Sequence, residues 1–214
     1  MGIQERKMRE REALRRQIIA IATEQFSTGG YEAVKMRDIA EAAEYSVGTI
    51  YNQFEDKNTL FLAVQEAAFE RALEHMQATV NGEMDPLDEL HAIGEAYIRF
   101  GLAHPHLYRL MFMLDSPMQA LDRPEGWSCG LQMHQLLSAV VNECMEVGVL
   151  PQVDPVQMSF ALWSMVHGMV SLRITERLDI YSGEHLPDVP PIHNPDEMMI
   201  KTMRMVHHLF SDQA

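Results

Sequence analysis

A short polar stretch, EYSVGTIYNQF at residues 44–54, carries the side chains best suited to chemistry with another molecule. Its small and amide-bearing members are Ser46, Gly48, Thr49, Asn52 and Gln53. Small residues allow a close approach, and hydroxyl and amide groups hydrogen bond to base edges and to phosphate oxygens. The stretch therefore indicates a surface that could read a nucleic acid.

Apolar residues at helical spacing within and before this stretch predict two short helices that cross each other. They are Met36, Ile39, Ala40, Ala43, Tyr45, Val47, Ile50 and Phe54. A small residue at the crossing, Ala40, lets the helices approach closely, as in a helix-turn-helix whose second helix lies in the major groove. Arg37 and Lys57 stand at the starts of two helices, where phosphates are favoured. On spacing alone, a plain helical hairpin with a solvated polar face stays open.

The rest of the chain predicts an all-α protein of about nine helices, because apolar residues recur at helical spacing and no alternating strand pattern appears. The first helix is expected at about residues 10–28. Asp85-Pro86 and Asp154-Pro155 each place a capping residue before a proline, which is typical of a helix start. Prolines and polar residues indicate loops at 117–124 and 186–195.

Charge supports a division into a helix-turn-helix head with a basic arm, residues 1–57, and a larger helical body, residues 58–214. The whole chain has a net charge of −14, yet residues 1–57 hold nine basic and ten acidic side chains. The basic arm consists of Arg6, Lys7, Arg9, Arg11, Arg15 and Arg16. Exposed charges more than about 8 Å apart are largely screened at physiological salt. The acidic body therefore leaves the head able to meet DNA and disfavours non-specific adsorption.

Several classes of function find no support in the residues. The histidine pairs at 104 and 106 and at 207 and 208 lack i,i+4 spacing, and no cysteine or carboxylate completes a tetrahedral set. No phosphate loop, nucleophile elbow or paired-acid signature appears, so we expect no catalytic residue, metal or cofactor. The N-terminus lacks the apolar core of a signal peptide, and no run approaches 18 apolar residues. We expect a soluble, cytoplasmic protein with no membrane partner.

A combination of residues between about Ile18 and Val64 carries a resemblance to a known family. They are Phe26, Gly30-Tyr31, Arg37-Asp38-Ile39-Ala40, Ser46-Val47-Gly48-Thr49-Ile50-Tyr51, Phe54, Lys57 and Leu60. Together they resemble the DNA-binding domain of the tetracycline-repressor (TetR) family of bacterial transcription regulators. The resemblance implies a homodimer that binds a palindromic operator in double-stranded DNA and releases it when a small molecule enters the C-terminal domain.

The resemblance also implies roles for single residues. The positions that match typical DNA contacts are Arg37, Thr49, Tyr51, Asn52 and Lys57, with Val47 and Gly48 against the bases and Ser46 beside them. The chain departs from the family at two positions. Glu44 replaces the usual turn glycine. A non-glycine residue held left-handed costs roughly 1–2 kcal/mol, so either the turn differs from that of the family or the domain is less stable. Lys35 replaces a serine or threonine cap, and it could meet a phosphate instead.

In the body, aromatic, histidine and methionine residues of three helices could converge on a small-molecule pocket. They are Phe100, His104, Tyr108, Met111, Met133, Trp163 and His167. Methionine is flexible and polarizable, so such a lining adapts to apolar ligands, although the same residues could form an ordinary core. HLYRLMF and the trio Trp163, His167 and Gly168 are similar to a subgroup of TetR ligand domains named for its Trp-His-Gly motif.

The last two helices carry more apolar surface than a lone monomer should expose, and with the resemblance they predict the dimer interface. Their apolar residues lie within 156–172 and at Met198, Met199, Met203, Val206, Leu209 and Phe210. EDKN at residues 55–58 opens a long helix that is expected to run to about Met76. The leading hypothesis is a ligand-responsive transcription regulator, a repressor by family default, whose two heads change their separation through this helix. The alternatives are a helical interaction or scaffold protein and a small histidine-rich α-helical enzyme. Effector, operator and target genes are not specified by the residues.

Overall fold

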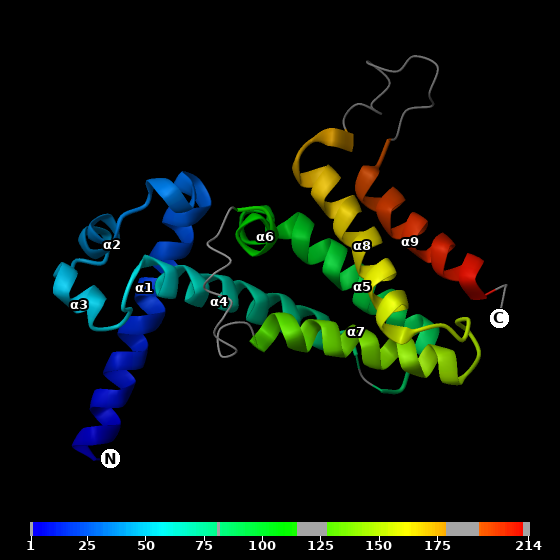
Figure 1. Ribbon diagram of the computed structural model, residues 1–214, viewed down its shortest axis with the longest axis horizontal. Coiled ribbons are helices and arrows are strands. Elements are labelled where there is room, and N and C mark those ends of the chain that lie inside the picture. Colours follow the sequence, from blue (N-terminus) through cyan, green and yellow to red (C-terminus); the bar gives the residue numbers. More distant parts are fainter. Residues whose placement is uncertain (1, 81, 115–127, 179–192, 212–214) are drawn as a thin grey trace. The chain divides into compact units, whose positions relative to one another are not determined.

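The computed structural model describes residues 2–80, 82–114, 128–178 and 193–211 of the chain, without the side chains of 209–211. All regular structure in these ranges is helical, which confirms the all-α prediction (Figure 1). The helices are α1 (Ile3–Ala33), α2 (Met36–Ala42), α3 (Val47–Tyr51), α4 (Lys57–Gln77), α5 (Pro86–Ala103), α6 (Pro105–Phe112), α7 (Ser128–Glu146), α8 (Pro155–Ile174) and α9 (Pro195–Ser211). The loop predicted at 117–124 and most of the one at 186–195 lie outside the described residues.

The helix starts follow the predicted capping chemistry in one case and not in the other. Asp154 Oδ1 accepts a hydrogen bond of 2.8 Å from the Val156 amide and caps α8. Asp85 precedes α5 with the same extended backbone, but its side chain makes no cap hydrogen bond. Both helices begin with proline, so the proline does not decide whether the preceding aspartate supplies the cap.

The first helix is longer than the sequence predicts, because it begins at Ile3 and not near residue 10. Glu5 Oε2 accepts a hydrogen bond of 3.0 Å from the Gly2 amide, which satisfies one donor at the helix start. Near its other end, Gly30 adopts φ 73°, a left-handed conformation that glycine tolerates at little cost. The basic arm is therefore a helical extension of the head.

The helices gather into two compact units. The first consists of Met1–Glu70 and His106–Gly130, and the second of Arg71–Pro105 and Leu131–Ala214. Among the described helices, α4, α6 and α7 each have residues in both units. The predicted division into a head and a body at residue 57 is a functional one, and it stays a prediction.

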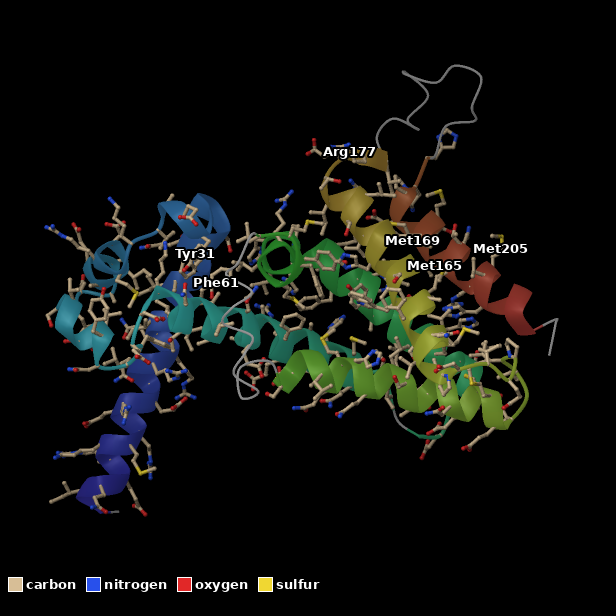
Figure 2. The ribbon with its side chains drawn as sticks, viewed as in Figure 1. Tyr31, Phe61, Met165, Met169, Arg177 and Met205 are labelled. Atoms are coloured by element: carbon tan, nitrogen blue, oxygen red, sulfur yellow. The ribbon has the colours of Figure 1, made fainter. Side chains whose placement is uncertain are left out.

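Three aromatic rings form the centre of the first unit. The Phe26 and Phe61 rings meet edge to face with centroids 4.9 Å apart, and Tyr31 meets Phe61 in the same way at 5.0 Å (Figure 2). Edge-to-face pairs add about 0.5–1.5 kcal/mol beyond their area burial. This cluster joins the C-terminal half of α1 to α4, and beside it Ile18 and Ala22 are fully buried.

In the second unit, α5 packs against both α8 and α9. At Gly94 α5 approaches α9 closely, since a Cβ atom placed there would clash with the sulfur of Met203 in α9. Met203 is itself fully buried. Within the described residues, no helix is both long and apolar enough to cross a bilayer.

Two buried histidines stack between α5 and α9. The rings of His91 and His207 lie 5.0 Å apart at an angle of 2°, and His208 meets His91 at 5.5 Å. Burial lowers the pKa of His207 to about 3, and the neighbouring His91 and His208 add to the effect. Burial also lowers the pKa of His91, with Arg204 and His208 assisting and Asp88 opposing. The contact between α5 and α9 thus requires neutral rings.

Acidification is expected to destabilise the fold, since unfolded His207 takes up a proton near its ordinary pKa of 6.5 while the folded residue does not until about pH 3. The stabilisation is complete above pH 6.5 and declines by roughly 1.4 kcal/mol per pH unit below it. Urea unfolding at pH 7 and pH 5 measures this loss, which should shrink in His207→Phe. The same change at the exposed His193 is the control and should leave the loss as in the wild type. An equal loss in both variants would contradict the role of the stack.

Candidate nucleic-acid interface

α2 and α3 form the predicted pair of crossed helices, and their contact is apolar. Ile39, Ala40 and Ala43 of this region and Ile50 of α3 are 0–2% exposed. α2 and α3 pack together, and the small Ala40 side chain of α2 is buried. Burial of this face leaves the opposite side of α3 on the surface.

The turn between the two helices keeps a left-handed residue although that residue is not a glycine. Glu44 adopts φ 60°. The turn is closed by hydrogen bonds from the Glu44 amide to the Glu41 carbonyl, 3.1 Å, and from the Tyr45 amide to the Ala40 carbonyl, 3.0 Å. A non-glycine residue here costs roughly 1–2 kcal/mol, so the head keeps its turn geometry at the expense of stability.

The exposed side of α3 combines apolar and polar groups. Val47 is 37% and Tyr51 50% exposed, and Gly48 and Asn52 also lie on the surface. Tyr45, which the sequence placed among the packing residues, is 44% exposed and adds a second phenol beside them. That part of the prediction is wrong for Tyr45 and Val47, because Ile50 occupies the buried side of the five-residue α3 and both residues lie outside that contact. Helical spacing alone does not reveal which apolar residues a short helix leaves outside.

Two of the predicted DNA-contacting residues also stabilise the start of α3. Ser46 Oγ accepts a hydrogen bond of 3.1 Å from the Thr49 amide, and the two side-chain hydroxyls lie 2.8 Å apart. Ser46 is therefore the N-terminal cap of α3, a role worth about 1 kcal/mol. Thr49 is half-buried. Arg37 and Lys35 are exposed at the start of α2, within the same unit.

Lys57 has a structural role that the sequence did not predict. Its ammonium group donates a hydrogen bond of 3.0 Å to the Tyr31 carbonyl and lies 4.2 Å from the centre of the Tyr31 ring. The Tyr31 hydroxyl in turn hydrogen bonds to Asn58. These contacts tie the end of α1 to the first turn of α4, which Asp56 caps by accepting from the Thr59 amide at 2.7 Å. The D-x-x-T spacing of Asp56 and Thr59 is the sequence signal for that cap.

The predicted effector residues are divided between the two units. Phe100, His104, Met133, Trp163 and His167 belong to the second unit, and Tyr108 and Met111 are buried in the first. The Phe100 and His104 rings lie 5.1 Å apart, and those of Trp163 and His167 lie 5.2 Å apart. That these seven residues line one pocket stays a prediction.

His167 has a polar partner within the second unit. Its Nδ1 lies 3.2 Å from the Tyr97 hydroxyl, and burial lowers the pKa of its ring. In a neutral imidazole one ring nitrogen donates a hydrogen bond and the other accepts one, and the tautomer decides which does which. Such a ring could hydrogen bond to a small polar ligand. A separate surface hollow of about 540 Å³ lies along α9, and its lining residues are His193, Asn194, Glu197, Met198, Lys201, Thr202 and Met205.

The thiols and the acidic and histidine side chains offer little metal or redox chemistry in the described part of the chain. There, no group of three or more His, Cys, Asp or Glu residues is placed to hold a metal ion. Burial and the nearby Glu66 raise the pKa of Cys129 to about 11, and burial with Glu143 raises that of Cys144 to about 12. Both thiols are protonated at neutral pH and are weak nucleophiles.

Two family models match separate parts of the chain. The model of the bacterial regulatory proteins of the tetR family matches residues 18–64, and that of the tetracyclin repressor-like C-terminal domain matches residues 90–186. The first covers the helix-turn-helix, and the second covers most of α5 and all of α6 to α8. The two models leave residues 1–17 and α9 unmatched.

Curated relatives are similar over part of their length. The HTH-type transcriptional repressor KstR of Rhodococcus jostii is 49% identical over 45 residues, which are 21% of this chain and 21% of that protein. The HTH-type transcriptional activator FasR of Mycolicibacterium smegmatis is 30% identical over 105 residues, 49% of this chain and 48% of that protein. The matches span from about a fifth to half of the length of these relatives.

Solved structures share the fold over almost the whole chain. A protein of unknown function from Rhodococcus sp. RHA1 has a TM-score of 0.69 at 22% identity, with 92% of this chain and 95% of that chain covered. A bacterial regulatory protein in the tetR family from Rhodococcus RHA1 has a TM-score of 0.66 at 16% identity, with 92% and 97% covered. At such identities the likeness concerns the fold.

A serine at position 35 should stabilise the head. Lys35 has the extended backbone of a cap, φ −116° and ψ 147°, but no side-chain cap hydrogen bond. In Lys35→Ser a hydroxyl can accept from an amide of the first turn of α2, and the free energy of unfolding should rise by about 1 kcal/mol. Urea denaturation measures it. Lys35→Ala, which removes the same charge without supplying an acceptor, should bring no such gain; equal effects of the two changes would contradict the missing cap.

Proposed function

This chain belongs to the TetR family of bacterial transcription regulators, and we propose that it is a ligand-responsive repressor that binds a palindromic operator as a homodimer. The observation that carries the proposal is the exposed side of α3, whose apolar side is buried while its polar and aromatic side is presented to solvent. Members of this family are regulators and not enzymes, so the alternative of a histidine-rich enzyme is set aside.

The exposed residues of α3 suit a major groove. The Asn52 amide can pair with an adenine edge, and the Val47 side chain can contact a thymine methyl group. Gly48 lies between them along the helix and allows the backbone to approach the bases. The Tyr51 hydroxyl can reach a phosphate and fix the register of the helix on the duplex.

A homodimer would form through α8 and α9. Met165, Met169 and Leu172 recur at i, i+4 and i+7 along α8, and Leu172 is 47% exposed. Met205 of α9 is 55% exposed and also belongs to the second unit (Figure 2). An apolar surface on two adjacent helices is the usual sign of an interface, and a twofold dimer would present two heads to half-sites about 34–36 Å apart or a multiple of that.

The route from an effector to the head would run along α4. Within the first unit, Gln65 donates a buried hydrogen bond of 2.9 Å to the Leu110 carbonyl of α6, and Glu66 Oε1 accepts one of 2.9 Å from the Cys129 amide in the first turn of α7. A ligand that displaces α6 or α7 would therefore pull on α4 and change the separation of the heads. Coupling of this kind is typically about 1–3 kcal/mol, which weakens binding five- to 150-fold.

The direction of regulation is the part that a reporter assay decides. Among the relatives, KstR is named a repressor and FasR an activator. We propose repression in the cytoplasm, with release by an effector. A reporter gene is placed under the control of the DNA upstream of the gene that encodes this chain. Expression of the chain should lower reporter expression, and a rise in reporter expression would indicate an activator.

Tyr51 and Lys57 should separate recognition from stability. Tyr51→Ala removes an exposed ring, so we expect at least a tenfold loss of operator affinity and a change in unfolding free energy within about 0.5 kcal/mol. Lys57→Ala also removes the contacts with Tyr31, so it should lower stability by roughly 1–2 kcal/mol in addition. Gel shifts with the DNA upstream of the gene measure operator affinity, and thermal unfolding measures stability. If Tyr51→Ala binds the operator as tightly as the wild type does, the exposed side of α3 is not the surface that contacts DNA. That result would favour the alternative of a scaffold protein.

A charge on the methionine face of α8 should dissociate the dimer. Met169→Glu would bury a carboxylate against the second copy, a cost of several kcal/mol that exceeds the usual gain of such a contact. Light scattering after size exclusion should show a monomer at micromolar concentration. Val147→Glu places the same charge at a 59% exposed residue after α7 and should stay dimeric. A dimer in both variants would place the interface elsewhere.

A further inference from the structure

The N-terminal part of α1 extends beyond the packed core of the first unit as an exposed helix (Figure 1). Every described residue from Gly2 to Ala13 is exposed, and the first buried residue of α1 is Ile18. No buried apolar contact fixes the direction of these exposed residues. Its charged side chains therefore decide what it can contact.

Arg15 shows which side of this extension lies next to α3. Its Nη1 donates a hydrogen bond of 3.3 Å to the Gln53 carbonyl, and its guanidinium carbon lies 4.3 Å from the centre of the Phe54 ring. Both residues directly follow α3 and its C-terminal cap Asn52. Lys7 and Arg11 lie eight and four residues before Arg15, on the same face of the helix.

Lys7, Arg11 and Arg15 form a basic row, and the acidic residues of the arm lie off it. Glu5 accepts from the Gly2 amide, and Glu10 pairs with Arg6 at 3.5 Å. Within the described residues, the side chains of Lys7 and Arg11 form neither an ion pair nor a hydrogen bond. The row thus presents two solvated cations about 6 Å apart along the helix axis, at 1.5 Å per residue.

α3 needs such a source of positive charge. The stretch from Glu44 to Asp56 contains three acidic residues and no lysine or arginine, and Lys57 is held by Tyr31. Affinity for DNA depends largely on cations that neutralise phosphates and release counterions. α2 and its cap supply two exposed cations, Lys35 and Arg37. The negative charges of Asp38 and Glu41 on the same helix offset their positive charge.

We propose that Lys7 and Arg11 bind phosphates of the DNA that flanks the half-site read by α3. The arm would lie along the backbone with its basic row toward the duplex, and Arg15 would hold it there through Gln53 and Phe54. The inference rests on the proposed function, because it requires that α3 lies in a groove. It adds a contact that carries no base sequence and lengthens the site on each side.

The dependence of operator affinity on salt tests this contact in the full-length dimer. The variant Lys7→Gln/Arg11→Gln removes two cations from each protomer and keeps good helix formers. Because each phosphate contact contributes about 0.9 to the slope of log affinity against log salt, the slope of the dimer should decrease by about 3.6. Phosphate-ethylation interference should lose its flanking positions while the central ones remain.

The matched control is Arg9→Gln/Arg16→Gln, which removes two exposed cations from the opposite face of the same helix. Its slope should change by less than about 1 if the row makes the contacts. Equal changes in the two variants, or an unchanged slope in Lys7→Gln/Arg11→Gln, would overturn the inference. Failure of the wild-type dimer to bind its operator would instead refute the proposed function, so the two failures are distinguishable.

Discussion

A helix of five residues cannot persist in water by itself, because too few hydrogen bonds compensate for ordering its backbone. α3 therefore depends on the apolar contact that buries Ile50 against α2 and on the Ser46 cap at its first turn. The left-handed Glu44 sets the angle between the two helices. These few interactions orient every residue that α3 presents to solvent, so the exposed side of α3 is a consequence of packing and not of α3 alone.

The same packing holds the head to the rest of its unit. The Phe26 and Tyr31 rings of α1 both contact the Phe61 ring of α4. The Lys57 ammonium group of α4 lies over the Tyr31 ring. A displacement of α4 would therefore move the helix-turn-helix as a body. The polar contacts of Gln65 and Glu66 join α6 and the first turn of α7 to that helix.

Helical periodicity predicts the all-α fold and the crossed pair of helices, because burial of one face leaves a 3.6-residue pattern. The missing cap at Lys35 also follows from residue type, whereas the left-handed conformation of Glu44 runs against the preference of its residue type. The exposure of Tyr45 and the internal bonds of Lys57 do not, since they depend on which neighbours fill the space around them. The seven predicted effector residues are aromatic, histidine and methionine side chains that could equally form an ordinary core, and they lie in two units.

The central claim is that α3, presented twice by a symmetric dimer, reads a specific sequence. Selection of bound duplexes from a random double-stranded DNA pool by the purified chain tests it most directly. The account predicts enrichment of an inverted repeat whose half-site centres lie about 10 base pairs or a multiple of that apart. A pool that stays random after repeated rounds, or enrichment of a single unrepeated motif, would contradict it.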